Sequence, residues 1–175
     1  GTSGSEVNKF SKRFAEYQQA KHGICVTNGT VTLEIILRGL GIGYGDEVIV
    51  PPYTFNATVS SVVFVGATPV FVDIEDGTYN IDPEKIEEAI TPNTKAIIPV
   101  HIGGRACNMD RIMEIAKKHN LYVIEDCAHA HGSEWKGRRV GSIGDAGSFS
   151  FQASKNLTAG EGGFITVNDT NLFEK

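Results

Sequence analysis

The sequence lacks an excess of positive charge and any long apolar run. Sixteen Lys and Arg residues stand against 21 Asp and Glu residues, a formal net charge of −5. We therefore expect no contact with nucleic acid or with an anionic membrane surface. No apolar run approaches the roughly 20 residues that cross a bilayer, and residues 1–20 lack the apolar core of a signal peptide.

Cysteine is also scarce. The three cysteines are odd in number and form no CxxC pair: Cys25, Cys107 and Cys127. This pattern predicts neither a disulfide framework nor a zinc site, and we expect no metal. A reducing, cytoplasmic setting fits this cysteine usage best.

What is present is an alternation of short apolar runs and segments with helical periodicity. The predicted strands are Ile24–Thr27, Glu47–Val50, Thr68–Val72, Lys95–Val100, Leu121–Glu125, Gly147–Phe151 and Gly163–Val167. The predicted helices are Val31–Leu40, Ala57–Val65, Pro83–Ile90 and Met109–His119. Such alternation predicts an α/β fold, a mainly parallel sheet covered by helices. The final "NDTNLFEK" reads as the start of a helix, so we expect the chain to continue in a longer protein.

The glycine-rich stretch "GLGIGYG" (Gly39–Gly45) resembles a dinucleotide-binding loop only superficially. That loop must follow a strand and open a helix. Here the stretch follows a predicted helix and leads into a strand, so a helix C-cap and turn is the better interpretation.

Three segments at predicted strand ends carry candidate functional groups. Asp126 ends the strand "LYVIED", and ligands in open α/β sheets bind at the carboxyl ends of strands. In "VTNGT", Gly29 and Thr30 begin a helix, where free N–H groups and a hydroxyl suit a phosphate. "PPYTFNAT" places Tyr53 and Phe55 after another strand. Taken singly, an ion pair, an ordinary N-cap and core packing explain these residues equally well.

Lys155 changes this balance. It follows a strand that carries Ser150 and precedes "TAGEGG", whose glycines permit close backbone approach. A desolvated lysine can act as a nucleophile. A lysine, an aspartate, an aromatic ring and a phosphate-binding helix start are together the parts that a pyridoxal phosphate site requires. Strand alternation further predicts that Ser148, Ser150 and Gln152 share one face, opposite the neighbouring phenylalanines.

The motifs resemble those of the DegT-type aminotransferases, whose best-known members act on keto sugars and keto cyclitols. The matching segments are "TNGT", "PPYTFNAT", "ATPVFVDI", "PVHIGG", "EDCAHAHG" and "GDAGSFSFQASKNLTAGEGG". The resemblance covers nearly all 175 residues. It implies a fold-type I pyridoxal phosphate enzyme in which residues 1–175 form most of the cofactor-binding large domain. The resemblance also leads us to expect that the family's C-terminal small domain is absent from these residues.

The resemblance also implies roles for single residues. Lys155 matches the Schiff-base lysine, and Asp126 matches the partner of the pyridine nitrogen. Phe55 falls at the ring-stacking aromatic position, and Gly29, Thr30 and Ser150 fall at phosphate-binding positions. His129 stands where many members carry glutamine, near the phenolic oxygen of the cofactor; it either donates a hydrogen bond there or packs beside Asp126.

The implied reaction takes an amino group from glutamate or glutamine and gives it to a cyclic ketone. The implied assembly is a homodimer with shared active sites. The alternatives are another reaction on the same cofactor (dehydration, decarboxylation or aldol chemistry) and a non-catalytic regulator of the same fold. A relative that performs dehydration carries histidine in place of this lysine, so Lys155 argues against dehydration. The form of the lysine segment favours a cyclitol or an aminobenzoate precursor as acceptor.

Overall fold

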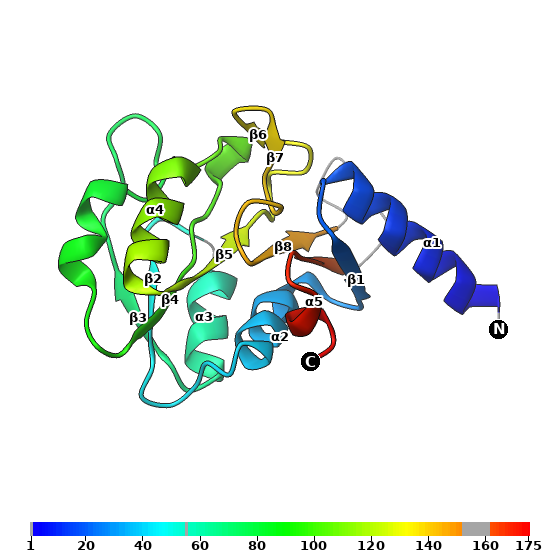
Figure 1. The fold of residues 1–175 in the computed structure, drawn as a ribbon, viewed down its shortest axis with the longest axis horizontal. Helices are drawn as coiled ribbons and strands as arrows, with labels where there is room; N and C mark the ends of the chain where they lie inside the picture. The colour runs from blue at the N-terminus through cyan, green and yellow to red at the C-terminus, as the bar shows by residue number, and fades with distance from the viewer. Residues whose placement is uncertain (1, 55, 152–161) are drawn as a thin grey trace.

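A seven-stranded sheet forms the centre of the molecule (Figure 1). The computed structural model describes residues 2–54, 56–151 and 162–175. The strands of the sheet are β1 (His22–Val26), β2 (Glu47–Val50), β3 (Thr68–Phe71), β4 (Thr94–Ile97), β5 (Tyr122–Asp126), β8 (Ala146–Ser150) and β9 (Gly163–Val167). Their order in space is β1-β9-β8-β5-β4-β2-β3, and a separate hairpin pairs β6 (Glu134–Trp135) with β7 (Arg138–Arg139).

The sheet is mainly parallel, which confirms the α/β prediction. Strands β3, β2, β4, β5 and β8 are joined by parallel pairings, and β9 is antiparallel to both of its neighbours, β8 and β1. The carboxyl ends of β5 and β8 therefore meet at one edge of the sheet, where side chains from both strands come close together.

Helices cover both faces of this sheet. Their bounds are α1 (Thr2–Tyr17), α2 (Thr32–Gly39), α3 (Asn56–Phe64), α4 (Met109–His119) and α5 (Thr170–Phe173). Apolar residues of α2 and α3 pack with Ile124 and Ala146 on one face, and those of α4 pack with Val123 on the other. Because Val123 and Ile124 are neighbours on β5, the two cores lie on opposite faces. None of the described helices is long and apolar enough to span a membrane.

One predicted helix has a different form. The segment predicted as Pro83–Ile90 forms two short 3-10 helices, Pro83–Lys85 and Glu87–Ala89. Asp82 caps the first by accepting from the N–H of Glu84 at 3.0 Å, as its position before a proline suggested. Pro92 disfavours the helical conformation at Thr91, so the segment cannot readily continue as a longer helix.

Helix α1 was not predicted, although its aromatic residues have helical spacing. Phe10 and Phe14 are four residues apart and therefore share one face. The ring of Phe14 lies 5.3 Å from that of Phe149, 5.0 Å from Phe151 and 4.6 Å from Phe164, measured between centroids. Helix α1 extends away from the body at the β1 end of the sheet (Figure 1), and it is attached through this aromatic cluster.

Candidate functional site

The backbone of Asp126 is held at the carboxyl end of β5 by the strands on either side. Its N–H donates to the carbonyl of Pro99 at 2.9 Å, and its carbonyl accepts from the N–H of His101 at 3.1 Å. On the other side Asp126 is the register partner of Ser148 in β8. The position of this residue is therefore determined by the sheet, as its place at the end of an apolar strand predicted.

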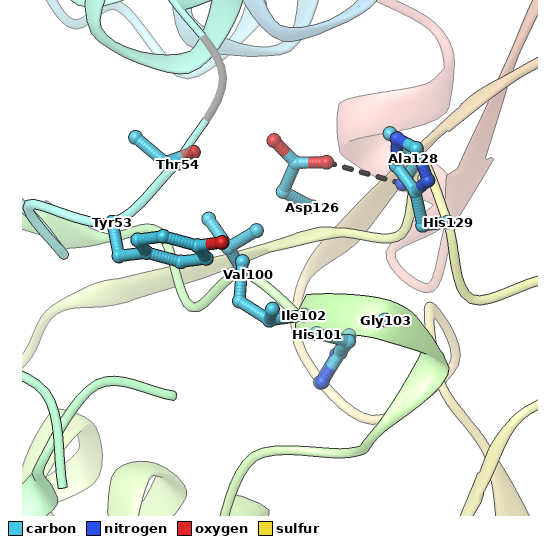
Figure 2. Close-up of a pocket in the computed structure, with 9 residues that line it drawn as sticks. All are labelled: Tyr53, Thr54, Val100, His101, Ile102, Gly103, Asp126, Ala128 and His129. Carbon is cyan, nitrogen blue, oxygen red and sulfur yellow. Dashed lines mark hydrogen bonds between the residues drawn. The ribbon is translucent and has the colours of Figure 1, made fainter. Parts of the chain in front are cut away.

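The side chain of Asp126 faces a cavity of about 430 Å³. The cavity is lined by Tyr53, Thr54, Val100, His101, Ile102, Gly103, Asp126, Ala128 and His129. In Figure 2 the carboxylate projects between Thr54 and His129. These residues come from segments that follow β2, β4 and β5, so the cavity lies at the carboxyl edge of the sheet.

Two neutral groups hold the Asp126 carboxylate, which is 5% exposed. The hydroxyl of Thr58 donates to Oδ2 at 2.7 Å, and the N–H of Ala128 donates to Oδ1 at 3.1 Å. The hydroxyl of Thr54 donates in turn to Thr58 Oγ1 at 2.7 Å. Sequence reasoning missed both threonines. Their spacing of four residues across a helix start was the available signal.

His129 lies on the turn that follows β5, and it lines the same cavity as Asp126. The N–H of Ala130 donates to the carbonyl of Cys127 at 3.0 Å and closes this turn. His129 is exposed. The structure thus brings together two of the predicted site residues, Asp126 and His129.

Gly29 and Ser150 form a second contact between predicted site residues. A Cβ placed on Gly29 would lie 2.6 Å from Ser150 Oγ, so only glycine allows this approach. Gly163 is equally constrained, because its Cβ would lie 2.7 Å from the Cα of Gly29. Ser150 is 8% exposed, and its hydroxyl has no hydrogen-bond partner among the described residues. The hydroxyl of Ser148, two residues earlier, is bonded to Thr32.

The helix start beside Gly29 is capped by Asn28. Its side-chain oxygen accepts from the N–H of Thr30 at 2.7 Å, so this N–H is not a free donor for a phosphate. The side chain of Thr30 is exposed, and its hydroxyl is the group that this residue can offer. Thr32 Oγ1 donates to the carbonyl of Gly29 at 2.7 Å, which stabilises the turn at the helix start. Asn28 and Thr32 were not among the predicted site residues.

The Gly29–Ser150 contact lies on the same face of the sheet as Asp126. Residues Ile124 and Ala146 belong to the core under α2 and α3, and Asp126 and Ser150 continue these faces by strand alternation. Phe149 and Phe151 belong to the aromatic cluster on the opposite face. The predicted alternation of β8 is therefore confirmed for the described residues, while Gln152 lies outside them.

Two further predicted residues, Phe55 and Lys155, lie outside the described part of the chain. The structure describes residues on both sides of these positions. Thr54 lines the cavity and Asn56 begins α3. Phe151 donates its N–H to the carbonyl of Gly162 at 2.9 Å, directly after Ser150.

On the other face of β5, Glu125 is the centre of a buried hydrogen-bond network. Its Oε2 accepts from the N–H groups of Ile143 at 3.0 Å and Gly144 at 2.8 Å. Its Oε1 lies 3.0 Å from His101 Nε2. His101 Nδ1 accepts from the N–H of Cys107 at 3.0 Å, so the ring proton is on Nε2 and is donated to Glu125.

His101, Glu125 and Cys127 offer donor atoms within 4.8 Å of one another, a grouping that also suits a metal ion. Burial raises the pKa of the Cys127 thiol to about 12. A metal ligand must be a thiolate, and the histidine and the glutamate already bond to each other. We therefore interpret this grouping as a structural network.

The family model described as the DegT/DnrJ/EryC1/StrS aminotransferase family matches residues 1–175. The chain is 51% identical over 172 residues to the GDP-perosamine synthase of Caulobacter vibrioides, covering 98% of the chain and 46% of that protein. It is 54% identical over 173 residues to the dTDP-3-amino-3,6-dideoxy-alpha-D-galactopyranose transaminase of Aneurinibacillus thermoaerophilus, covering 98% and 48%.

Solved structures show the same similarity. The aminotransferase from Psychrobacter cryohalolentis superposes with a TM-score of 0.94 at 53% identity, over 96% of this chain and 43% of that one. The protein ntda of Bacillus subtilis, solved with bound cofactor pmp, superposes with a TM-score of 0.90 at 38% identity, over 95% and 38%. The chain thus spans less than half the length of each of these proteins.

Proposed function

Since the chain belongs to the DegT/DnrJ/EryC1/StrS aminotransferase family, we propose that residues 1–175 form most of the large domain of an enzyme that binds pyridoxal 5'-phosphate. The proposed reaction moves an amino group from glutamate or glutamine to a cyclic ketone. The acceptor class is a keto sugar, a nucleotide-linked keto sugar or a keto cyclitol. The names of the two relatives, a GDP-sugar synthase and a dTDP-sugar transaminase, support a sugar-type acceptor.

The observation that carries this proposal is the placement of Asp126. A buried carboxylate with two neutral donors faces a cavity of about 430 Å³. Each oxygen accepts one protein hydrogen bond and can accept another. A charged donor such as a protonated ring nitrogen forms the strongest hydrogen bond with such a group.

The Gly29–Ser150 contact also fits the cofactor. Glycine at position 29 lets the helix start approach Ser150 closely, because a Cβ there would lie 2.6 Å from Ser150 Oγ. The hydroxyl of Ser150 is available among the described residues, and the helix start adds a favourable dipole for an anion. Ser150, Thr30 and Gly29 would bind the phosphate group, on the same face of the sheet as Asp126.

When bound, pyridoxal phosphate supplies an aldehyde and an electron-accepting ring. Asp126 would hold the proton on the ring nitrogen, because an opposite charge favours the charged form. His129 would donate a hydrogen bond to the phenolic oxygen, and Phe55 would stack on the ring. Lys155 would attach the cofactor and then move the proton at the α-carbon of the substrate as general acid and base.

The same proposal includes a homodimer with shared active sites and a cytoplasmic location. The family resemblance supports the dimer, since members take a phosphate-binding residue from the neighbouring subunit. The cysteine usage supports a reducing compartment.

The test is the site of cofactor attachment. Borohydride reduction of the holoenzyme, followed by peptide mapping, should place the cofactor on Lys155. Attachment to another lysine, or no attachment, would contradict the proposal.

Assays of the same holoenzyme against keto sugars, nucleotide-linked keto sugars and keto cyclitols, with glutamate and glutamine as donors, identify the acceptor and the donor. Cofactor attachment together with dehydration, decarboxylation or aldol cleavage, and no amino transfer, would contradict the proposed reaction while leaving the cofactor site intact. Cofactor attachment without any turnover would indicate a regulatory relative.

A further inference from the structure

We propose that Thr58 is a positioning residue that sets the orientation of the Asp126 carboxylate towards the cofactor. This inference rests on the proposed function. It concerns a side chain that does not line the cavity but forms hydrogen bonds with two residues that do, Thr54 and Asp126. Thr58 is fully buried in the first turn of α3.

The carboxylate of an aspartate needs such a partner because its last side-chain torsion does not by itself fix the plane of the carboxylate. The last torsion of aspartate joins an sp³ to an sp² carbon and has a broad energy minimum. Asp126 receives one hydrogen bond on each oxygen, from Thr58 on Oδ2 and from the N–H of Ala128 on Oδ1. Two donors from different elements, α3 and the turn after β5, fix the plane of the carboxylate. With one of them removed, that plane can rotate.

The hydroxyl of Thr58 is itself directed at Asp126. A hydroxyl has a single proton, and Thr58 Oγ1 accepts from Thr54 Oγ1 at 2.7 Å while it donates to Asp126 at 2.7 Å. Threonine is also β-branched, so few rotamers are open to it in a helix. The chain Thr54–Thr58–Asp126 therefore has one direction of donation, which ends on the carboxylate.

A second hydroxyl in the same helix behaves differently. Ser61, which is 2% exposed, donates to the carbonyl of Ala57 at 2.6 Å, four residues earlier. This is the usual bond of a hydroxyl inside a helix. Thr58 does not form this bond, because its hydroxyl donates its proton to Asp126 instead. Ser61 thus provides a matched control, since it is a buried hydroxyl of α3 that forms no hydrogen bond with Asp126 among the described residues.

The experiment compares Thr58→Val, Thr58→Ser and Ser61→Ala in the holoenzyme. Valine keeps the shape of threonine and removes the donor; serine keeps the donor. Three quantities are measured: cofactor affinity by titration of the cofactor-free protein, the visible circular dichroism of the bound cofactor, and turnover at saturating cofactor. Thermal unfolding of the cofactor-free variants reports any loss of stability.

For Thr58→Val we expect altered circular dichroism and about a 10- to 100-fold loss of turnover, the range for one hydrogen bond to a charged group. Cofactor affinity should fall less, because the phosphate contacts remain. Thr58→Ser should restore turnover to within a few-fold of the natural protein, and Ser61→Ala should match it in all cofactor measurements.

Equal behaviour of Thr58→Val and Ser61→Ala, with normal circular dichroism and turnover, would overturn the inference while the proposed function stands. Failure to trap the cofactor on Lys155 would instead overturn the proposed function. If Thr58→Val does not fold, Thr58→Ala decides. That variant removes the same donor without placing a methyl group against the carboxylate, and it should alter the circular dichroism; an unchanged spectrum would contradict the inference.

Discussion

Glu125 and Asp126 are neighbours on β5, yet the two carboxylates have opposite surroundings. Both are buried, with exposed fractions of 0% and 5%. Glu125 points to the face covered by α4 and receives three hydrogen bonds from the protein, two from backbone N–H groups and one from His101. Asp126 points to the face covered by α2 and α3 and receives two, while its free side meets the cavity.

This difference distinguishes a structural carboxylate, Glu125, from Asp126, the carboxylate that we propose binds the cofactor. A buried charge is tolerated when donors surround it, and this describes Glu125, which joins the segments around His101 and Ile143. Asp126 is oriented by one hydrogen bond on each oxygen. Each oxygen can accept a further hydrogen bond, including one from a charged donor. Burial alone therefore does not distinguish the two carboxylates. The number of hydrogen bonds that each receives from the protein and the cavity beside Asp126 do.

Replacing Asp126 should have the largest effect of the substitutions that test this difference between the two carboxylates. We expect Asp126→Asn to bind the cofactor but to lose turnover by about 1,000-fold, which corresponds to about 4 kcal/mol in the barrier. The amide carries no charge to hold a proton on the ring nitrogen. The free energy of unfolding should change little, because the amide oxygen can accept from Ala128 and both threonine hydroxyls can rotate. Thr58 then accepts from the amide NH₂ and donates to Thr54. Steady-state kinetics at saturating cofactor measure the effect, and near-normal transamination would show that Asp126 is structural.

Replacing Glu125 should have the converse effect. In Glu125→Gln the NH₂ group must face either His101 Nε2–H or the N–H groups of Ile143 and Gly144, so at least one buried donor loses its partner. We expect the free energy of unfolding to fall by about 2–3 kcal/mol, with turnover at saturating cofactor within about tenfold of the natural protein.

Urea denaturation measures this loss of stability. Glu134→Gln is the control, because Glu134 is exposed and pairs with Arg139 only at 3.8 Å. The same change of charge there should cost less than about 1 kcal/mol. A stable Glu125→Gln variant with impaired catalysis would reverse the roles assigned to the two carboxylates.

The smallest expected effect is a loss of cofactor affinity, and it tests whether the phosphate binds on the face of the sheet where Asp126 and Ser150 lie. Ser150→Ala and Thr30→Ala should each weaken cofactor affinity by about one to two orders of magnitude, because each removes a hydroxyl from the proposed phosphate site. Turnover at saturating cofactor should fall much less, since the phosphate anchors the cofactor and does not react.

Thr166→Val is the matched control for this titration. Thr166 is fully buried, and its hydroxyl donates to the carbonyl of Gly141 at 2.8 Å on the face opposite Ser150. Its removal should lower stability without changing cofactor affinity. Unchanged affinity in both Ser150→Ala and Thr30→Ala would mean that the phosphate binds elsewhere.

Periodicity was sufficient to predict most elements. The predicted strands agree with the observed ones to within a few residues, because the apolar runs are short and most are rich in β-branched or aromatic residues. The prediction of one helix over Pro83–Ile90 was wrong in form, because the segment folds as two short 3-10 helices. Pro92, which follows it, disfavours its extension into a longer helix. Helix α1 was missed because its stability comes from aromatic contacts with β8 and β9, which are distant in sequence.

The sequence by itself determined the alternation of strands and helices, the place of Asp126 at a strand end and the face on which Ser150 lies, because each follows from local spacing. The partners of these groups were decided only by the tertiary structure. Thr58 is 68 residues from Asp126, and Gly29 meets Ser150 from the other end of the chain. The direction of a hydrogen bond and the space that a Cβ would fill depend on packing between elements, and no local pattern encodes them.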